Sequence, residues 1–234
     1  MKAVILVGGQ GKRLRPFTFA IPKPLLPVGE KPVLEILFEQ LRAGGIRDLV
    51  LATGHQAELI RAFCGDGSRF GVSVTYVHED IPLGTAGPLA LAREQLLGED
   101  FFLLMNGDIL AELDFRRFVE SARSGDCDLT VAYTRHLYRS PYGVLSLADG
   151  AVQDIVEKPE QEFPVSAGIY CLKPAALEFV PQGVFFTVPD LVHRLLAAGR
   201  RINAYLIEGY WIGLESVEHF DEALRRLDKL AGSV

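Results

Sequence analysis

Short apolar runs alternate with amphipathic stretches along most of the chain, and this alternation predicts its main elements. Residues 3–7 form an uninterrupted run of Ala, Val, Ile and Leu, which is too short for a core helix and predicts a buried strand. Similar runs predict strands at residues 48–53, 72–77, 101–105, 129–134 and 202–207. Apolar residues three and four positions apart predict helices at residues 31–43, 56–63, 88–97, 114–123, 174–180, 188–198 and 217–230.

Because these strands and helices alternate at short intervals, we expect an α/β fold with a doubly wound, mostly parallel mixed sheet. Residues 142–147 and 151–156 differ, since they are two short apolar segments on either side of Asp149-Gly150. That pattern predicts a β-hairpin, and with it a small antiparallel portion. Ligands of parallel sheets bind at the carboxyl ends of the strands, so the loops that follow the strands are the candidate sites.

The first predicted strand leads directly into a loop rich in glycine and in positive charge. Its glycines are Gly8, Gly9 and Gly11, and its cations are Lys12, Arg13 and Arg15. Glycines let the backbone approach a ligand closely, and exposed N–H groups beside cations form an anion-binding nest. The loop therefore predicts phosphate binding, with an ordinary tight turn as the alternative. Its spacing matches neither the P-loop nor the dinucleotide-binding fingerprint.

Residues 22–27 read PKPLLP, and three prolines in this segment stiffen the chain around Lys23. Together, GGxGxRLxP and PKPLLP resemble the signature of the sugar-1-phosphate nucleotidylyltransferases, among them mannose-1-phosphate guanylyltransferase and its relatives. The resemblance extends from residue 1 to about residue 230. It implies a Rossmann-like nucleotide-diphospho-sugar transferase fold in one domain, 1–234. Residues 1–135 would mainly bind the nucleotide, and residues 136–234 would mainly bind the sugar phosphate and end in the C-terminal helix.

The resemblance also implies roles for residues near the nucleotide. The predicted nucleotide-binding residues are Val7, Gly8, Gly9, Gly11, Lys12, Glu79, Gly84, Thr85 and Gly87. The last three belong to the motif PLGTAG, which resembles the nucleoside-facing loop of the family. Arg13 and Lys23 would be catalytic, the first by stabilising the leaving pyrophosphate and the second by orienting phosphate. Lys12 stands where many family members have Thr or Ser.

The motif Asn106-Gly107-Asp108 directly follows the apolar run 101–105. A carboxylate beyond a central strand and beside phosphate loops is suited to a hard divalent cation, although an Asp that caps the following turn is the alternative. In the family the matching aspartate binds Mg²⁺. The resemblance therefore implies Mg²⁺ as cofactor and Asp108 as a metal ligand and catalytic residue.

Three further motifs resemble the sugar-phosphate side of the family. They are Tyr-Gly at 142–143, Glu-Lys-Pro at 157–159 and Val-Ser-Ala-Gly-Ile-Tyr at 165–170. The residues implied to bind the sugar phosphate are Tyr142, Gly143, Glu157, Lys158, Ser166 and Gly168, and Lys158 would also be catalytic. A surface ion pair between Glu157 and Lys158 is the alternative. Ser166 replaces the usual Asn, which implies a shortened or water-mediated sugar contact.

The last motif, Trp-Ile-Gly-Leu-Glu at 211–215, departs from the family pattern W-x-D-x-G. Gly213 stands where the second Mg²⁺ ligand belongs, and Glu215 stands where the glycine belongs. Three alternatives stay open: Glu215 is a longer metal ligand, a solvent or nucleotide oxygen fills the position, or catalysis is lost.

The composition limits the classes of partner. The net charge of −6 argues against a nucleic-acid partner, and no apolar stretch approaches the roughly 18 residues that span a membrane. The three cysteines are far apart, which argues against a disulfide framework and favours a reducing, cytoplasmic compartment. Apolar residues near the C-terminal helix would suit either a homo-oligomer or a packed helix face, so the oligomeric state stays open.

The implied reaction is transfer of GMP from GTP to a mannose-, heptose- or glucosamine-type sugar 1-phosphate, which gives a nucleoside-diphosphate sugar and pyrophosphate. PLGTAG looks more like the guanylyltransferases than the thymidylyltransferases, yet uridylyl and thymidylyl transfer remain alternatives. A non-catalytic regulatory homologue that binds nucleotide sugars is another, because Gly213 permits it. A cytidylyltransferase-like reaction, or transfer onto a cofactor, is a third, against which the Tyr-Gly and Glu-Lys-Pro motifs weigh.

Overall fold

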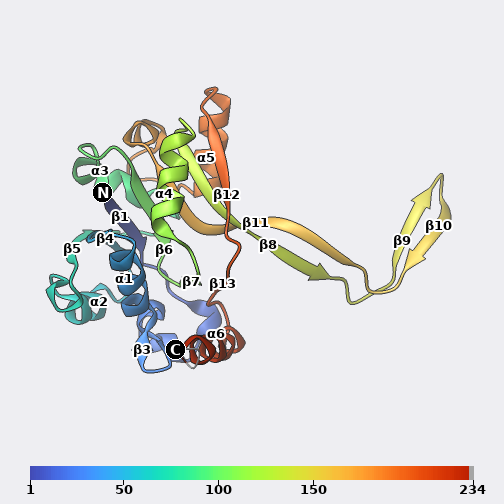
Figure 1. Ribbon diagram of the computed structural model, residues 1–234, viewed down its shortest axis with the longest axis horizontal. Helices are drawn as coiled ribbons and strands as arrows, with labels where there is room; N and C mark the ends of the chain where they lie inside the picture. The colour runs from blue at the N-terminus through green and yellow to red at the C-terminus, as the bar shows by residue number, and fades with distance from the viewer. Residues whose placement is uncertain (232–234) are drawn as a thin grey trace.

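The computed structural model describes residues 1–231, with side-chain surroundings through Arg226. A seven-stranded sheet in the order β12-β8-β11-β6-β1-β4-β5 forms the centre of the body (Figure 1). Its strands are β1 (Lys2–Leu6), β4 (Asp48–Thr53), β5 (Ser73–His78), β6 (Phe102–Asn106), β8 (Leu129–Arg139), β11 (Glu160–Leu172) and β12 (Ile202–Leu206). All neighbours run parallel except β11, which is antiparallel to β6 and β8. The expected mostly parallel mixed sheet is confirmed.

Helices cover both faces of this sheet, as the doubly wound expectation requires. They are α1 (Val33–Ala43), α2 (Ala57–Cys64), α3 (Pro88–Leu96), α4 (Phe115–Ser124), α5 (Val188–Ala197) and α6 (Val217–Ala231). Alternate residues of β1 enter opposite cores: Ala3 and Ile5 pack with α1, α2 and α4, whereas Val4 packs with α3 and α5. Since both faces are buried, β1 is apolar without alternation, which is why its sequence predicted a central strand.

The segment after β1 folds back on itself through three short 3₁₀ helices, η1 (Lys12–Leu14), η2 (Phe17–Phe19) and η3 (Lys23–Leu25). Leu14 is buried, and the buried Thr18 hydroxyl donates to the Gly11 carbonyl at 2.9 Å. A short pair, β2 (Pro27–Val28) with β3 (Lys31–Pro32), follows. The sequence predicts a helix from residue 31, but α1 begins at Val33 because Lys31 and Pro32 are extended.

Other differences from the sequence expectations are local. Residues 174–180 form a 3₁₀ helix, η5 (Pro174–Phe179), in place of the predicted α-helix. Two strands that the sequence did not reveal, β7 (Ile109–Ala111) and β13 (Trp211–Gly213), pair antiparallel and bring the 211–215 motif beside the segment that follows Asp108. None of the helices within residues 1–231 is long and apolar enough to cross a membrane.

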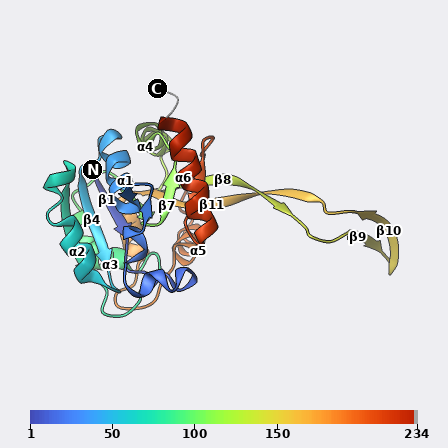
Figure 2. The same ribbon diagram turned by 90° about the horizontal axis from the view of Figure 1, so that it is seen from below.

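A long arm extends from the body (Figures 1 and 2). It consists of residues 135–164: the distal parts of β8 and β11 and, at the tip, the hairpin β9 (Val144–Ala148) with β10 (Ala151–Val156). A register shift between Ser166 and Ile169 marks its base. Every residue of β9 and β10 is exposed. The sequence predicted the hairpin, and the structure places it at the end of a two-stranded ribbon away from the body.

Candidate functional site

Two cavities meet at the carboxyl ends of β1 and β6. The first has a volume of about 540 Å³ and the second about 560 Å³, and both are lined by Asn106 and Asp108. Cavities of this size are typical of small-molecule sites. The sheet therefore places the end of β6 between two spaces, each of which suits one small ligand.

The glycine-rich loop forms one wall of the first cavity. Val7 donates its N–H to the Ala52 carbonyl at 2.9 Å, and the Gly8 carbonyl accepts from the N–H of His55 at 3.1 Å. These bonds fix the loop against the end of β4. Val7, Gly8 and Gly9 line the cavity, whereas Gly11, Lys12 and Arg13 do not.

Asp108 is positioned by the tight turn after β6. The Gly107 N–H donates to the Leu6 carbonyl at 2.9 Å, and a Cβ at Gly107 would lie only 2.7 Å from the same oxygen. Only glycine fits this approach, so the turn directs both Asn106 and Asp108 toward the cavities. Leu214 donates its N–H to the Asp108 carbonyl at 2.8 Å, which ties the turn to the 211–215 motif.

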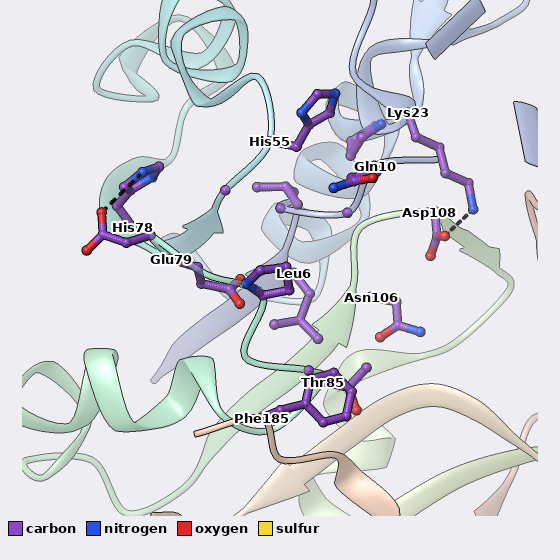
Figure 3. Close-up of a pocket in the computed structure, with 18 residues that line it drawn as sticks. Leu6, Gln10, Lys23, His55, His78, Glu79, Thr85, Asn106, Asp108 and Phe185 are labelled. Atoms are coloured by element: carbon purple, nitrogen blue, oxygen red, sulfur yellow. Dashed lines mark hydrogen bonds and ion pairs between the residues drawn. The ribbon is translucent and has the colours of Figure 1, made fainter. Parts of the chain in front are cut away.

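Lys23 reaches the same point from η3. Its ammonium group contacts the Asp108 carboxylate (Figure 3), and the two side chains are 14% and 30% exposed. This ion pair lies where the two cavities join. The prolines on either side of Lys23 hold its backbone in place, which confines the position from which the ammonium group extends.

The donor set at this point fits a magnesium ion. The Asp108 carboxylate and the Asn106 amide are hard oxygen donors, and Mg²⁺ is usually held by one or two carboxylates together with substrate phosphates and water. Among residues 1–226 no group of three or more His, Cys, Asp or Glu is arranged as a complete metal site. Asp108 and Asn106 would thus form only the protein's share of the coordination.

Glu215 lies on the wall of the second cavity but contacts a different partner. Its carboxylate accepts a hydrogen bond from the guanidinium of Arg13, and its N–H donates to Nδ1 of His219 at 3.2 Å. Gly213 has open surroundings: a Cβ there would first meet the Trp211 ring, at 3.8 Å. In this arrangement Glu215 links the glycine-rich loop to α6.

Residues of the 79–87 segment form a second wall of the first cavity, and Glu79 lies beside Gly8. The Glu79 carboxylate accepts from the Leu83 N–H at 2.9 Å, and burial raises the pKa of this carboxyl, although that N–H acts in the opposite direction. Gly84 is in the left-handed region, with a φ of +80°, and a Cβ would be 2.7 Å from the Phe186 carbonyl oxygen. Gly84 and Thr85 line the cavity; Gly87 does not.

The loop before α5 is held against this wall. The Phe186 carbonyl accepts from the N–H groups of Ala86 and Gly87, each at 2.9 Å, and the Val188 N–H donates to the Thr85 hydroxyl at 2.9 Å. As a result Phe185 lines the mouth of the first cavity beside Thr85 (Figure 3), with 67% of its surface exposed. The sequence reasoning missed Phe185; the only signal was an adjacent aromatic pair in a predicted loop.

The second cavity is lined by Ser166 and Gly168, two of the residues predicted to bind the sugar phosphate, together with residues that the motifs did not indicate. The Ser166 hydroxyl hydrogen-bonds the Tyr170 hydroxyl at 2.8 Å, and burial raises the pKa of Tyr170. Trp211 donates its indole N–H to the Ala167 carbonyl at 2.9 Å. These contacts fix part of the lining of the second cavity, which also includes Arg135, His136, His219 and Glu222.

The remaining predicted residues, Tyr142, Gly143, Glu157 and Lys158, lie on the arm. A Cβ at Gly143 would be 3.1 Å from the Glu157 carboxylate, so the two motifs adjoin each other where the ribbon meets the hairpin. None of the four lines either cavity. These four residues, predicted to contact a sugar phosphate, therefore lie apart from both cavities of their own chain.

The sequence of this chain is similar to those of nucleotidyl transferases. The model of the nucleotidyl transferase family matches residues 2–228. Probable mannose-1-phosphate guanylyltransferase 1 of Oryza sativa is 36% identical over 96% of this chain and 64% of its own length. The mannose-1-phosphate guanyltransferase of Yarrowia lipolytica is 34% identical over 94% of this chain and 62% of its own length. The chain thus spans less than two thirds of these relatives.

Solved structures are similar over nearly their whole length. A putative glucose-1-phosphate thymidylyltransferase from Bacillus anthracis has a TM-score of 0.78 at 27% identity, over 97% of this chain and 94% of that chain. HddC from Yersinia pseudotuberculosis, in complex with GMP-PN, has a TM-score of 0.75 at 28% identity, over 97% and 99% of the two chains.

Proposed function

The chain belongs to the nucleotidyl transferase family, and from that premise we propose that it transfers GMP from GTP to a sugar 1-phosphate. The products are a nucleoside-diphosphate sugar and pyrophosphate. The observation that carries the proposal is the ion pair of Lys23 and Asp108 at the junction of two cavities. A reaction between two phosphorylated substrates needs such a point, where both can approach one set of charges.

The nucleotide occupies the first cavity. Its phosphates lie along the N–H groups of the glycine-rich loop, which act as an anion-binding nest. Its base lies toward Gly84, Thr85 and Phe185, at the other end of the same cavity. The sugar 1-phosphate occupies the second cavity, over Ser166 and Gly168. This arrangement directs the sugar phosphate oxygen toward the α-phosphorus of the nucleotide.

The reaction is an in-line displacement. A sugar phosphate oxygen forms a bond to the α-phosphorus, and the bond from that phosphorus to the oxygen of the departing pyrophosphate breaks. A phosphate oxygen is already anionic at neutral pH, so no general base is needed. Phosphoryl chemistry of this kind depends on positioning and charge stabilisation, which Lys23 and the glycine-rich loop provide.

Mg²⁺ bound by Asp108 and Asn106 would neutralise phosphate charge and orient the reacting groups. Lys23 then contributes a second positive charge at the same junction, directed toward the phosphates. Arg13 lies outside the first cavity and is paired with Glu215. It stabilises the outgoing pyrophosphate only after that pair opens.

Glu79 favours a base with a hydrogen-bond donor on a ring nitrogen, as guanine, uracil and thymine have, over adenine. Its carboxylate lines the first cavity and can only accept hydrogen bonds when ionised. Guanine presents donors at N1 and at the N2 amine, whereas adenine presents an acceptor at N1. The names of the relatives in Oryza sativa and Yarrowia lipolytica point to GTP and mannose 1-phosphate.

Pyrophosphate release tests the proposal. The four nucleoside triphosphates are combined with mannose, glucose, heptose and glucosamine 1-phosphates, each with Mg²⁺ and with EDTA. We expect release with GTP and a mannose-type sugar phosphate that EDTA abolishes. Release with UTP or dTTP alone contradicts the guanylyl assignment. No release from any pair, with nucleotide binding intact by calorimetry, contradicts catalysis.

A further inference from the structure

Within the part of the chain that the structure describes, the arm of residues 135–164 packs on no other element and exposes many large apolar side chains to solvent. Its large apolar side chains that are at least 41% exposed are Leu137, Tyr138, Tyr142, Val144, Leu145, Leu147, Val152, Ile155, Val156 and Phe163. A two-stranded hairpin that packs on nothing is marginally stable in water, and clustered apolar residues mark an interaction surface. The arm therefore has the character of a segment that another surface covers.

The body of the same chain could cover the arm only if the ribbon between them were broken. Six consecutive pairs, from Arg139 with Glu160 to Thr134 with Val165, form an unbroken antiparallel ladder. His136, which pairs with Phe163, lines the second cavity, and the five residue steps from Phe163 to Lys158 span roughly 16 Å at about 3.3 Å per residue. The ribbon holds its tip out (Figure 2), and folding it back would break backbone hydrogen bonds.

Within residues 1–226, the carboxylates that line the second cavity outnumber its Arg and Lys side chains, among which only Arg135 lines it. Its carboxylates are Asp108, Glu215 and Glu222, and Arg135 is paired with Glu162 at 3.7 Å. An anionic sugar phosphate next to these carboxylates needs additional positive charge. Lys158 carries such a charge where the ribbon meets the hairpin, and it lines neither cavity of its own chain.

We propose that the arm binds a second copy of this chain and that its Lys158 and Glu157 complete the second cavity of that copy. The inference deepens the proposed function and rests on it for the identity of the ligand. The cavity that needs additional positive charge and the arm that carries Lys158 belong to the same sequence, so two copies related by a twofold axis satisfy each other reciprocally. The length of the arm also fits, because one side of a stable interface uses about 20–30 residues.

The oligomeric state is the first test and does not depend on activity. Light scattering after size-exclusion chromatography should give a dimer for the unaltered chain. Leu147 and Val152 are cross-strand partners, so the double variant Leu147→Glu/Val152→Lys keeps the hairpin paired through opposite charges while it removes apolar surface. It should be monomeric. Leu97→Glu changes a similarly exposed leucine on the body and should stay dimeric.

Cross-linking tests where the arm binds. Chains with Lys158→Cys are mixed with differently tagged chains that carry Glu222→Cys, and a short bismaleimide is added. The native cysteines are buried, so they contribute little background. A covalent pair that contains both tags is expected. A dimer without this cross-link overturns the proposed contact, whether or not the protein has activity.

Complementation tests the shared site. Asp108→Asn inactivates the cavity and leaves the arm intact, whereas Lys158→Ala inactivates the arm and leaves the cavity intact. A purified heterodimer of the two contains one complete site of two, and should recover about half of the wild-type rate. If each arm served its own chain, both sites would be defective and the heterodimer would stay at background.

The outcomes separate the two proposals. An active monomer, or an active dimer without complementation, overturns the exchange of arms and leaves the proposed function in place. If the protein is inactive but dimeric, and Lys158→Cys forms the cross-link, the exchange of arms holds and the proposed function is overturned.

Discussion

The ammonium group of Lys23 contacts the carboxylate of Asp108 although 85 positions separate the two residues in the chain. The contact brings together the proline-rich segment and the turn after the central strand β6. It also places a positive and a negative charge on the boundary between the two cavities.

Asp108→Asn should reduce turnover by at least about 10³-fold, because the substitution removes the charge that would hold a cation at the reacting phosphates. The fold should remain, since the shape of the side chain is conserved. Steady-state pyrophosphate release and circular dichroism measure the two effects. Asp114→Asn, at the N-terminus of α4, is the matched control and should keep its activity. Near-normal turnover of Asp108→Asn would remove this residue from the mechanism.

Gly213→Asp should be tolerated and should lower the Mg²⁺ concentration for half-maximal activity. A side chain at this position meets only ordinary van der Waals contacts, so the free energy of unfolding should change by less than about 0.5 kcal/mol. A second carboxylate beside the first would strengthen binding of a divalent cation. Magnesium titrations of activity measure the effect. An unchanged titration curve would mean that position 213 lies outside the coordination sphere.

Phe185→Ala should raise the KM for the nucleoside triphosphate by about 5-fold to 100-fold, with a smaller change in kcat. An aromatic side chain that stacks on a base contributes about 1–3 kcal/mol, and Phe185 is held at the mouth of the first cavity. Leu196→Ala, which truncates another exposed apolar side chain, on α5, serves as control. Equal KM values for Phe185→Ala and the wild type would contradict stacking.

Glu79→Gln should alter how stability depends on pH. Burial raises the pKa of the Glu79 carboxyl, so the folded chain holds this proton more tightly than the unfolded chain. The resulting stabilisation is complete below the unfolded pKa and is lost as pH rises through the folded pKa. Calorimetry without nucleotide measures the Tm of the wild type and of the variant. The Tm of the wild type minus that of the variant should therefore become larger as the pH is lowered from 7 to 4. A constant difference would mean that Glu79 is solvated as in the unfolded chain.

The three cysteines should resist alkylation in the folded protein. All three are buried, and burial raises the pKa of Cys64 and of Cys171 to about 12. At pH 8 about one thiol in 10⁴ of these two would be ionised, and the thiolate is the reactive form. Iodoacetamide and mass spectrometry should detect labelling only after addition of guanidinium chloride. Rapid labelling of Cys64 in the native protein would contradict its burial.

The sequence predicted the central sheet well because its signals are local. Residues 3–7 and 101–105 are apolar without alternation, and such runs are typical of strands that are covered on both faces. The loops after these strands were correctly expected at one edge of the sheet, since parallel strands share the direction of their carboxyl ends. That is why Gly8 and Asp108 line one cavity.

Features that depend on long-range pairing were not predictable in the same way. β11 runs antiparallel between two strands that are parallel to the rest of the sheet, and nothing in its own sequence states its direction. The pairing of Arg13 with Glu215 likewise depends on how α6 packs. Phe185 reached the first cavity through backbone bonds of Phe186 to Leu83 and Ala86, which leave no trace in side-chain patterns.

For the arm, the sequence predicted the local structure but not where that structure lies in the fold. Asp149-Gly150 indicated the hairpin, and β9 and β10 are indeed paired on either side of it. Whether the hairpin lies on the body or away from it depends on the ladder between β8 and β11. The roles inferred for Tyr142 and Lys158 stay predictions for this reason.

Neither of the two hydrophobic cores contains a residue of the arm. Selection for a stable fold therefore constrains residues 135–164 only weakly. Mutations there are constrained instead by the surface that the arm contacts outside its own chain. Substitutions at the exposed apolar positions of the arm should accordingly change what the chain binds, with little change in the free energy of unfolding of its body.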